Sequence, residues 1–190
     1  MHAQHFNKIA VWKSTYVNTM EFTTLHIKND IVVNGQITGE ALGKLLHVNY
    51  TLDINNKWEV QSFRIDLQSD TSFIISLHKN KTGQWVQGKE KIQTQLAGCM
   101  DIDISLTPFT NTLPIKRLNL PPGGSKEIMV IYIDLPNNQY KPASQRYTNL
   151  GNGIYKYENM ESGFTVNLEV DKDGLVMDYP GLWHRVLTKH

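Results

Sequence analysis

This sequence has little cysteine, little charge and no long apolar run. Its single cysteine, Cys99, cannot close an internal disulfide, which suits a reducing compartment. Charged residues make up 19% of the 190 positions, the formal net charge is +1, and lysine and arginine form no cluster, so we expect no nucleic-acid partner. Residues 1–11 hold two histidines and no apolar segment of signal-peptide or membrane-spanning length. We therefore predict a cytoplasmic protein without integral membrane association.

Motifs for catalysis and for cofactors are also missing. The seven histidines are scattered, and neither an HExxH pattern nor a Cys/His zinc spacing occurs. The GxSxG, P-loop and GxGxxG signatures are absent as well. Asp171–Gly174 begins like a calcium loop but lacks the later ligands and the closing glutamate, so it predicts a hairpin turn. We expect no catalytic residues, no metal site and no cofactor.

What the sequence does have is alternation of apolar and polar residues. This period of two is typical of half-buried strands, because successive side chains point to opposite faces of a sheet. It occurs around 48–54, 63–67, 73–77 and 164–170. Turn signals separate the alternating runs: Asn34-Gly35, Asn55-Asn56, Lys81-Thr82-Gly83, Gly123-Gly124, Gly151-Asn152-Gly153 and Asp173-Gly174. The pattern predicts an all-β, mainly antiparallel fold in one domain, 1–190, with a meander that curls into a roll or barrel.

One short helix is expected inside the curved sheet. Ile128–Leu135 is apolar on both faces, so both faces should be covered and something must pack within the curve. The best candidate is the segment 107–118, where Thr107 is suited to cap a helix with Pro108 at its first position. Alternatively, Thr110 caps a shorter turn. Pro114 argues against a long uninterrupted helix.

Two carboxylates share a face of a predicted strand. Asp101 and Asp103 alternate with Met100 and Ile102, and at this spacing they could bind a divalent cation or share a proton. The alternative is that they line the solvent face of the strand.

The densest polar group follows directly. It consists of Thr107, Thr110, Asn111, Thr112, Lys116 and Arg117. Hydroxyls and an amide can hydrogen-bond the oxygens of a sugar or head group, and the basic pair could meet an anion. Equally, the hydroxyls could cap turns while Lys116 and Arg117 remain solvated.

Four segments resemble a known family. LAGCMDID (96–103), TPFTNTLPIKRL (107–118), QRY (145–147) and VDKDGLVMDYPGLW (170–183) are similar to the signature of the putative glycolipid-binding family of bacterial proteins. Lys116 stands where we expect arginine, which keeps the charge but loses the planar fork that binds anions through two hydrogen bonds. The resemblance implies an antiparallel spiral β-roll around a single short helix, near 107–118, and likeness to carriers of lipids.

The resemblance also favours a non-catalytic protein that holds a glycolipid or another amphipathic ligand between the curved sheet and the helix. Its predicted ligand-binding residues are Asp101, Asp103, Asn111, Thr112, Lys116, Arg117 and Tyr147. Two alternatives stay open. One is an enzyme for a small polar substrate that uses Asp101, Asp103 or Asp178 beside Arg117. The other is an interaction module, with no small ligand, that forms a homo-oligomer through strands near Trp58 or Trp85.

Overall fold

The computed structural model describes residues 6–70, 72–89 and 91–189, which form one continuous sheet. The order of its fifteen described strands is β8-β7-β6-β5-β4-β3-β2-β1-β15-β14-β13-β12-β11-β10-β9. Their bounds are β1 Phe6–Ser14, β2 Asn18–Ile27, β3 Ile31–Ala41, β4 Lys44–Ile54, β5 Val60–Gln68, β6 Phe73–Lys79, β7 Trp85–Gln87, β8 Lys91–Ile92, β9 Cys99–Ile104, β10 Ser125–Asp134, β11 Gln139–Gly151, β12 Ile154–Asn159, β13 Thr165–Val170, β14 Val176–Tyr179 and β15 Trp183–Lys189. The predicted all-β class is confirmed.

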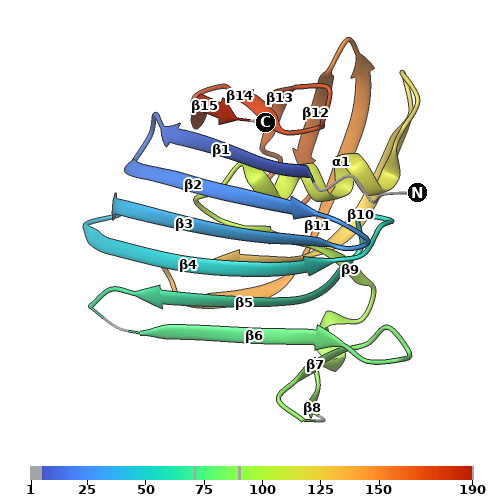
Figure 1. Cartoon of the computed structure of the whole chain (residues 1–190). Helices are drawn as coiled ribbons and strands as arrows, with labels where there is room; N and C mark the ends of the chain where they lie inside the picture. Colours follow the sequence, from blue (N-terminus) through green and yellow to red (C-terminus); the bar gives the residue numbers. More distant parts are fainter. Residues whose placement is uncertain (1–5, 71, 90, 190) are drawn as a thin grey trace.

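The sheet is a meander whose two halves join at the first and last strands. β1 pairs antiparallel with both β2 and β15, so the N-terminal half extends from this junction toward β8 and the C-terminal half toward β9 (Figure 1). The pairing of β9 with β10 is parallel, whereas the other described pairs are antiparallel. A mainly antiparallel sheet therefore needs only short connections along most of its length.

The far end of the sheet curls back onto its first half. Trp85 Nε1 donates a 2.8 Å hydrogen bond to the carbonyl of Cys99 in β9, and the rings of Trp85 and Phe63 meet edge to face at 5.5 Å. The prediction that Trp85 marks an exposed edge is wrong, because only 2% of this residue is exposed. β9 is thus packed against the β5–β7 region as well as paired with β10.

The predicted helix lies where the sequence placed it, in two pieces. A 3₁₀ turn covers Phe109–Asn111 and α1 covers Thr112–Leu118. Pro114 falls in the first turn of α1, where a missing backbone N–H costs nothing. Phe109 and Leu113 are fully buried in the same hydrophobic cluster as residues from both halves of the sheet. The sheet is therefore rolled around this helix, as predicted.

Most of the predicted turns are confirmed, but Asn34-Gly35 is not one of them. Both residues lie in the middle of β3. A Cβ on Gly35 would sit 1.9 Å from Cζ of Tyr50, so the glycine makes room for an aromatic ring that crosses the backbone. Turn-forming and close-packing glycines look identical in a single sequence.

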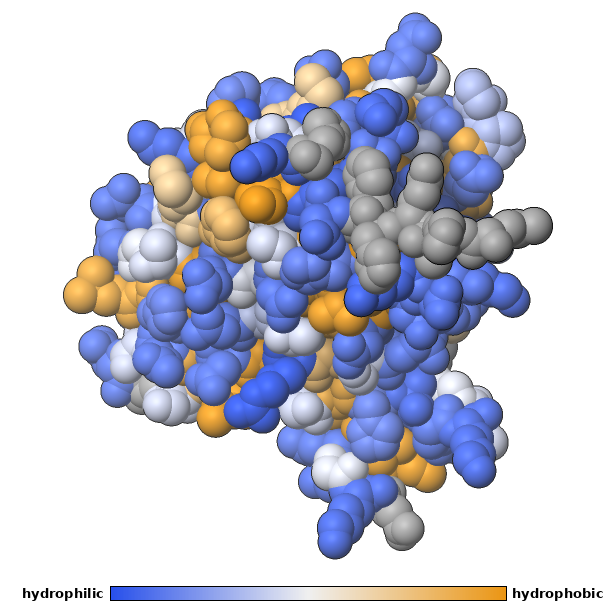
Figure 2. All heavy atoms as spheres, viewed as in Figure 1, coloured by the Kyte–Doolittle hydropathy of each residue, from blue (hydrophilic) through white to orange (hydrophobic). Residues whose placement is uncertain are grey.

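β2 reverses the usual arrangement of polar and apolar faces. Glu21 and Thr23 point inward and have no exposed surface, while Met20 and Phe22 are 43% and 44% exposed on the outside. Figure 2 shows a mostly hydrophilic surface interrupted by apolar patches on this side of the molecule. An inward carboxylate needs hydrogen-bond donors in the interior.

Candidate functional site

A cleft of about 260 Å³ opens where the ends of several strands of the C-terminal half lie close to the turn between β1 and β2. We call it the aromatic cleft, and it is lined by Tyr16, Asp103, Ile104, Ser105, Leu106, Thr107, Asn111, Tyr132, Tyr157, Asn159, Ser162, Phe164, Tyr179, Leu182 and Trp183. The residues come from the end of β9, the β9–α1 connection, strands β10, β12, β14 and β15, and the β1–β2, β12–β13 and β14–β15 turns. The cleft is therefore a product of the roll and not of any one segment.

Aromatic rings form its walls. Phe164 and Tyr179 stack with centroids 6.5 Å apart, and Tyr157 meets both rings at 6.2 and 6.4 Å. On the other side, Tyr16 meets Trp183 edge to face at 6.2 Å. Phe164 and Tyr16 are 42% and 48% exposed, so part of each ring is open to a ligand. Such ring clusters hold one another in place and offer apolar faces with little loss of side-chain entropy.

Two polar side chains of the cleft are held by residues from β11. Gln145 Nε2 donates a 2.6 Å hydrogen bond to Asp103, and Thr110 Oγ1 donates a longer one of 3.3 Å. Tyr147 donates its hydroxyl to Asn111 Oδ1 at 2.8 Å. Burial raises the pKa of Asp103, opposed by these hydrogen bonds. Both side chains are thus oriented before any ligand arrives.

The carboxylate of Glu21 lies behind the cleft. Thr107, which lines the cleft, has its hydroxyl 2.7 Å from both carboxylate oxygens. Tyr50 and Thr23 also donate hydroxyls to Glu21. Burial raises the pKa of Glu21 to about 7, although the three hydroxyl hydrogen bonds favour the charged form. Glu21 therefore gains or loses its proton near neutral pH.

The structure distributes the seven sequence-predicted site residues over four environments. Asp103 and Asn111 line the aromatic cleft, and Tyr147 stands directly behind Asn111. Thr112 is fully buried in α1, and its hydroxyl has no hydrogen-bond partner among the described residues. Lys116 lies apart from these residues, against Trp58.

Asp101 and Arg117 form the fourth environment, a closed ion pair. Arg117 Nε and Nη2 donate to the two oxygens of Asp101 at 2.9 and 2.5 Å, and Asp101 has no exposed surface. The interpretation that Asp101 lies on a solvent face is wrong, because Asp101 faces Arg117 of α1 and is completely buried there. The pair joins α1 to β9, and the carboxylate and the guanidinium are engaged with each other instead of with a ligand.

The sequence analysis missed Glu21 and the aromatic walls. Tyr16, Tyr132, Tyr157 and Phe164 lie in unrelated segments, and nothing in their spacing groups them. Tyr179 and Trp183 do fall in the resembling segment 170–183, which is the one signal that pointed to them. Glu21 is a single acid at an inward position of a strand, which the sequence pattern did not reveal.

The described residues show neither a metal cluster nor a membrane-spanning helix. No group of three or more His, Cys, Asp or Glu side chains is placed to hold a metal ion. No helix in the described part of the chain has the length and apolar character needed to cross a membrane.

Comparisons with known proteins agree with the fold. A crystal structure of a DUF1089 family protein from Pseudomonas aeruginosa superimposes with a TM-score of 0.77 at 35% sequence identity, over 87% of this chain and 92% of that one. The comparison with curated proteins finds no match. The model of the family described as "Putative glycolipid-binding" matches residues 9–185. This chain belongs to that family.

Proposed function

We propose that this chain is a non-catalytic binding protein for a glycolipid or similar amphiphile, and that the aromatic cleft holds its sugar. The observation that carries the proposal is the combination of stacked rings with the pre-oriented groups of Asp103 and Asn111. The family description supports binding of this kind in general terms.

The chemistry of the cleft suits a sugar ring. A pyranose has an apolar C–H face that packs on an aromatic ring and a rim of hydroxyls that need hydrogen-bond partners. Asp103 accepts hydrogen bonds from hydroxyls, and Tyr132 can donate one. Burial raises the pKa of Tyr132 to about 12, so this phenol stays protonated at neutral pH. A pocket with mostly aromatic walls and a few fixed polar groups is the usual form of a small-molecule site.

In this proposal the lipid tail does not lie between the curved sheet and the helix, where the sequence suggested it. The space between α1 and the sheet is occupied by Phe109, Leu113 and Ile115, all within the central hydrophobic cluster. We therefore place the tail at the mouth of the aromatic cleft, against the exposed parts of Phe164 and Tyr16.

The geometry gives less support to the enzyme alternative. Of the three aspartates considered, only Asp103 lines the aromatic cleft. Asp101 is held by Arg117, and Asp178 lies 3.5 Å from His184 in an exposed pair. An acid and a base facing one substrate need two free groups across one pocket.

Calorimetric titration with a panel of methyl and octyl glycosides tests this proposal. Phe164→Ala removes a ring from the wall and should weaken binding of the best glycoside about tenfold. Met160→Ala is the matched control, because Met160 is 39% exposed nearby in sequence and does not line the cleft. The proposal fails if no glycoside binds, or if both variants bind like the parent chain.

A further inference from the structure

A second pair of clefts, of about 510 and 530 Å³, lies apart from the aromatic cleft. The two share Asn56, Trp58, Lys116 and Lys172, so they adjoin each other, and neither shares a lining residue with the aromatic cleft. We call the larger one the lysine cleft. It is bounded by the β2–β3 turn, the β4–β5 turn, the end of α1 and the β13–β14 turn.

Positive charge dominates the lysine cleft. Four lysines and one aspartate line it: Lys8, Lys28, Lys116, Lys172 and Asp173. Asp173 pairs with Lys8 and lies 3.8 Å from Lys172. Among the described residues, no carboxylate lies within ion-pair distance of Lys28 or Lys116. These two ammonium groups are therefore left to attract an anion.

Lys116 is held in place by its surroundings. Its ammonium lies 5.5 Å from the centroid of the Trp58 ring, within cation–π range. On the other side, a Cβ on Gly174 would come within 2.8 Å of Lys116 Cδ. Gly174 also has φ +80°, so glycine meets both the conformational and the spatial demand of this turn. The Lys116 side chain thus packs against the β13–β14 turn while its ammonium lies over the Trp58 indole.

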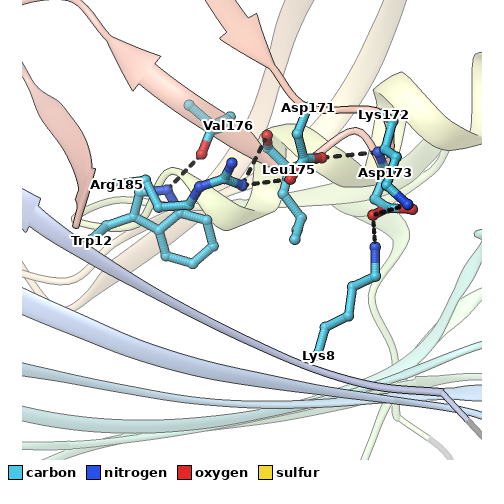
Figure 3. A network of polar contacts seen from close by, with 8 residues as sticks. All are labelled: Lys8, Trp12, Asp171, Lys172, Asp173, Leu175, Val176 and Arg185. Carbon is cyan, nitrogen blue, oxygen red and sulfur yellow. Dashed lines mark hydrogen bonds and ion pairs between the residues drawn. The ribbon is translucent and has the colours of Figure 1, made fainter. Parts of the chain in front are cut away.

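The β13–β14 turn that carries Gly174 is braced from two neighbouring strands (Figure 3). Asp171 accepts hydrogen bonds from the backbone N–H groups of Asp173 and Leu175 at 2.9 and 3.0 Å, and Arg185 from β15 donates to its other oxygen at 2.7 Å. Lys8 reaches from β1 to Asp173. This wall of the cleft is held in place without a ligand, so binding would cost little ordering entropy.

The floor of the lysine cleft is apolar. Leu25, Ile31 and Leu175 line it and are nearly completely buried, and Ile27 is partly exposed beside them. Charged groups at the rim over an aliphatic floor match a molecule with an anionic end and a short hydrocarbon tail.

We propose that the lysine cleft binds the anionic end of a single-chain amphiphile, a phosphate or carboxylate, with its first methylenes against Ile27 and Ile31. This site does not depend on the sugar site proposed above, because the two clefts have no lining residue in common.

Calorimetry with octyl phosphate on the full chain tests the assignment, with inorganic phosphate as the arm without a tail. We expect one octyl phosphate per chain, bound about tenfold more tightly than inorganic phosphate because the tail buries apolar surface. Lys28→Gln and Lys116→Gln should each weaken binding about fivefold to tenfold. Lys81→Gln makes the same charge change in the β6–β7 turn, outside both clefts, and should leave the affinity unchanged.

Phe164→Ala separates the two proposals, because it should leave octyl phosphate binding intact while weakening glycoside binding. Lys28 is exposed, so Lys28→Gln keeps the test valid even if a change at half-buried Lys116 disturbs folding. The assignment is overturned if octyl phosphate does not bind, if it binds no better than inorganic phosphate, or if Lys28→Gln binds it like the parent chain.

Discussion

Asp101 and Glu21 are both completely buried acids, yet their partners differ in kind. Asp101 faces a guanidinium that matches its two oxygens. Glu21 receives only neutral hydroxyls, from Thr23, Tyr50 and Thr107. A full countercharge compensates the cost of burying a carboxylate far better than hydroxyl dipoles do. Asp101 is therefore held in a buried ion pair that links α1 to β9, whereas Glu21 is a group near the cleft whose charge depends on pH.

Removal of the Asp101 countercharge should have the largest effect on stability. Arg117→Met leaves Asp101 as an unpaired buried charge and should lower the free energy of unfolding by about 3–5 kcal/mol. Urea denaturation measures the loss. Arg146→Met is the control, because Arg146 forms an exposed pair with Glu127 that should contribute less than about 1 kcal/mol. A loss for Arg117→Met as small as that of the control would show that Asp101 does not need its cation.

The pH dependence of the unfolding free energy tests whether the charge of Glu21 changes near neutral pH. The pKa of Glu21 is raised from its ordinary value of 4.5 to about 7, so the folded state holds a proton that the unfolded state has released between these values. The contribution of this bound proton to the unfolding free energy is fully present below pH 4.5 and is lost as the pH rises through about 7.

Glu21→Gln removes this titration while keeping the side-chain size. Relative to the variant, the parent chain should lose about 3 kcal/mol of unfolding free energy between pH 4.5 and pH 8. Denaturation curves of both chains at the two pH values give this difference directly. A difference that stays constant over the range would mean that Glu21 keeps the same charge throughout.

A smaller effect is expected when the Tyr50 hydroxyl is moved away from Glu21. Gly35→Ala would force the Tyr50 ring away from the backbone, at an expected cost of about 1–3 kcal/mol. Because the Tyr50 hydrogen bond favours the charged form of Glu21, its loss should raise the pKa of Glu21 further. The midpoint of the pH-dependent stability change reports the shift. Gln36→Ala, at the next and exposed position of β3, should change the unfolding free energy by less than about 0.5 kcal/mol.

Local patterns in the sequence predicted the fold well. Alternation located β4, β5, β6 and β13, and the Thr-Pro pair with the doubly apolar segment 128–135 located the buried helix. The expected cap was wrong in detail, because the 3₁₀ turn begins at Phe109 with Pro108 as its N-cap, although the Thr107 hydroxyl accepts a 2.9 Å hydrogen bond from the N–H of Phe109. Each of these features depends on neighbours in sequence, which is why periodicity and turn chemistry suffice.

The candidate site was harder to predict, because long-range contacts build it. Asp101 and Ile102 alternate in sequence but are both buried, since β9 is covered by distant residues such as Trp85 as well as by α1. Likewise, Tyr16 and Trp183 meet only because β1 pairs with β15. Asp103 was found from the spacing of two carboxylates, Asn111 from the density of polar residues around it, and Tyr147 because a resembling segment contains it. Tyr16, Tyr132, Tyr157 and Phe164 had no comparable signal.

A crystal structure of the chain with a bound glycoside tests the central claim most directly. The account predicts a sugar ring in the aromatic cleft, packed on Phe164 or Tyr179, with a hydroxyl at hydrogen-bond distance from Asp103. A glycoside bound elsewhere, or an aromatic cleft that holds no sugar when the ligand is saturating, would contradict it.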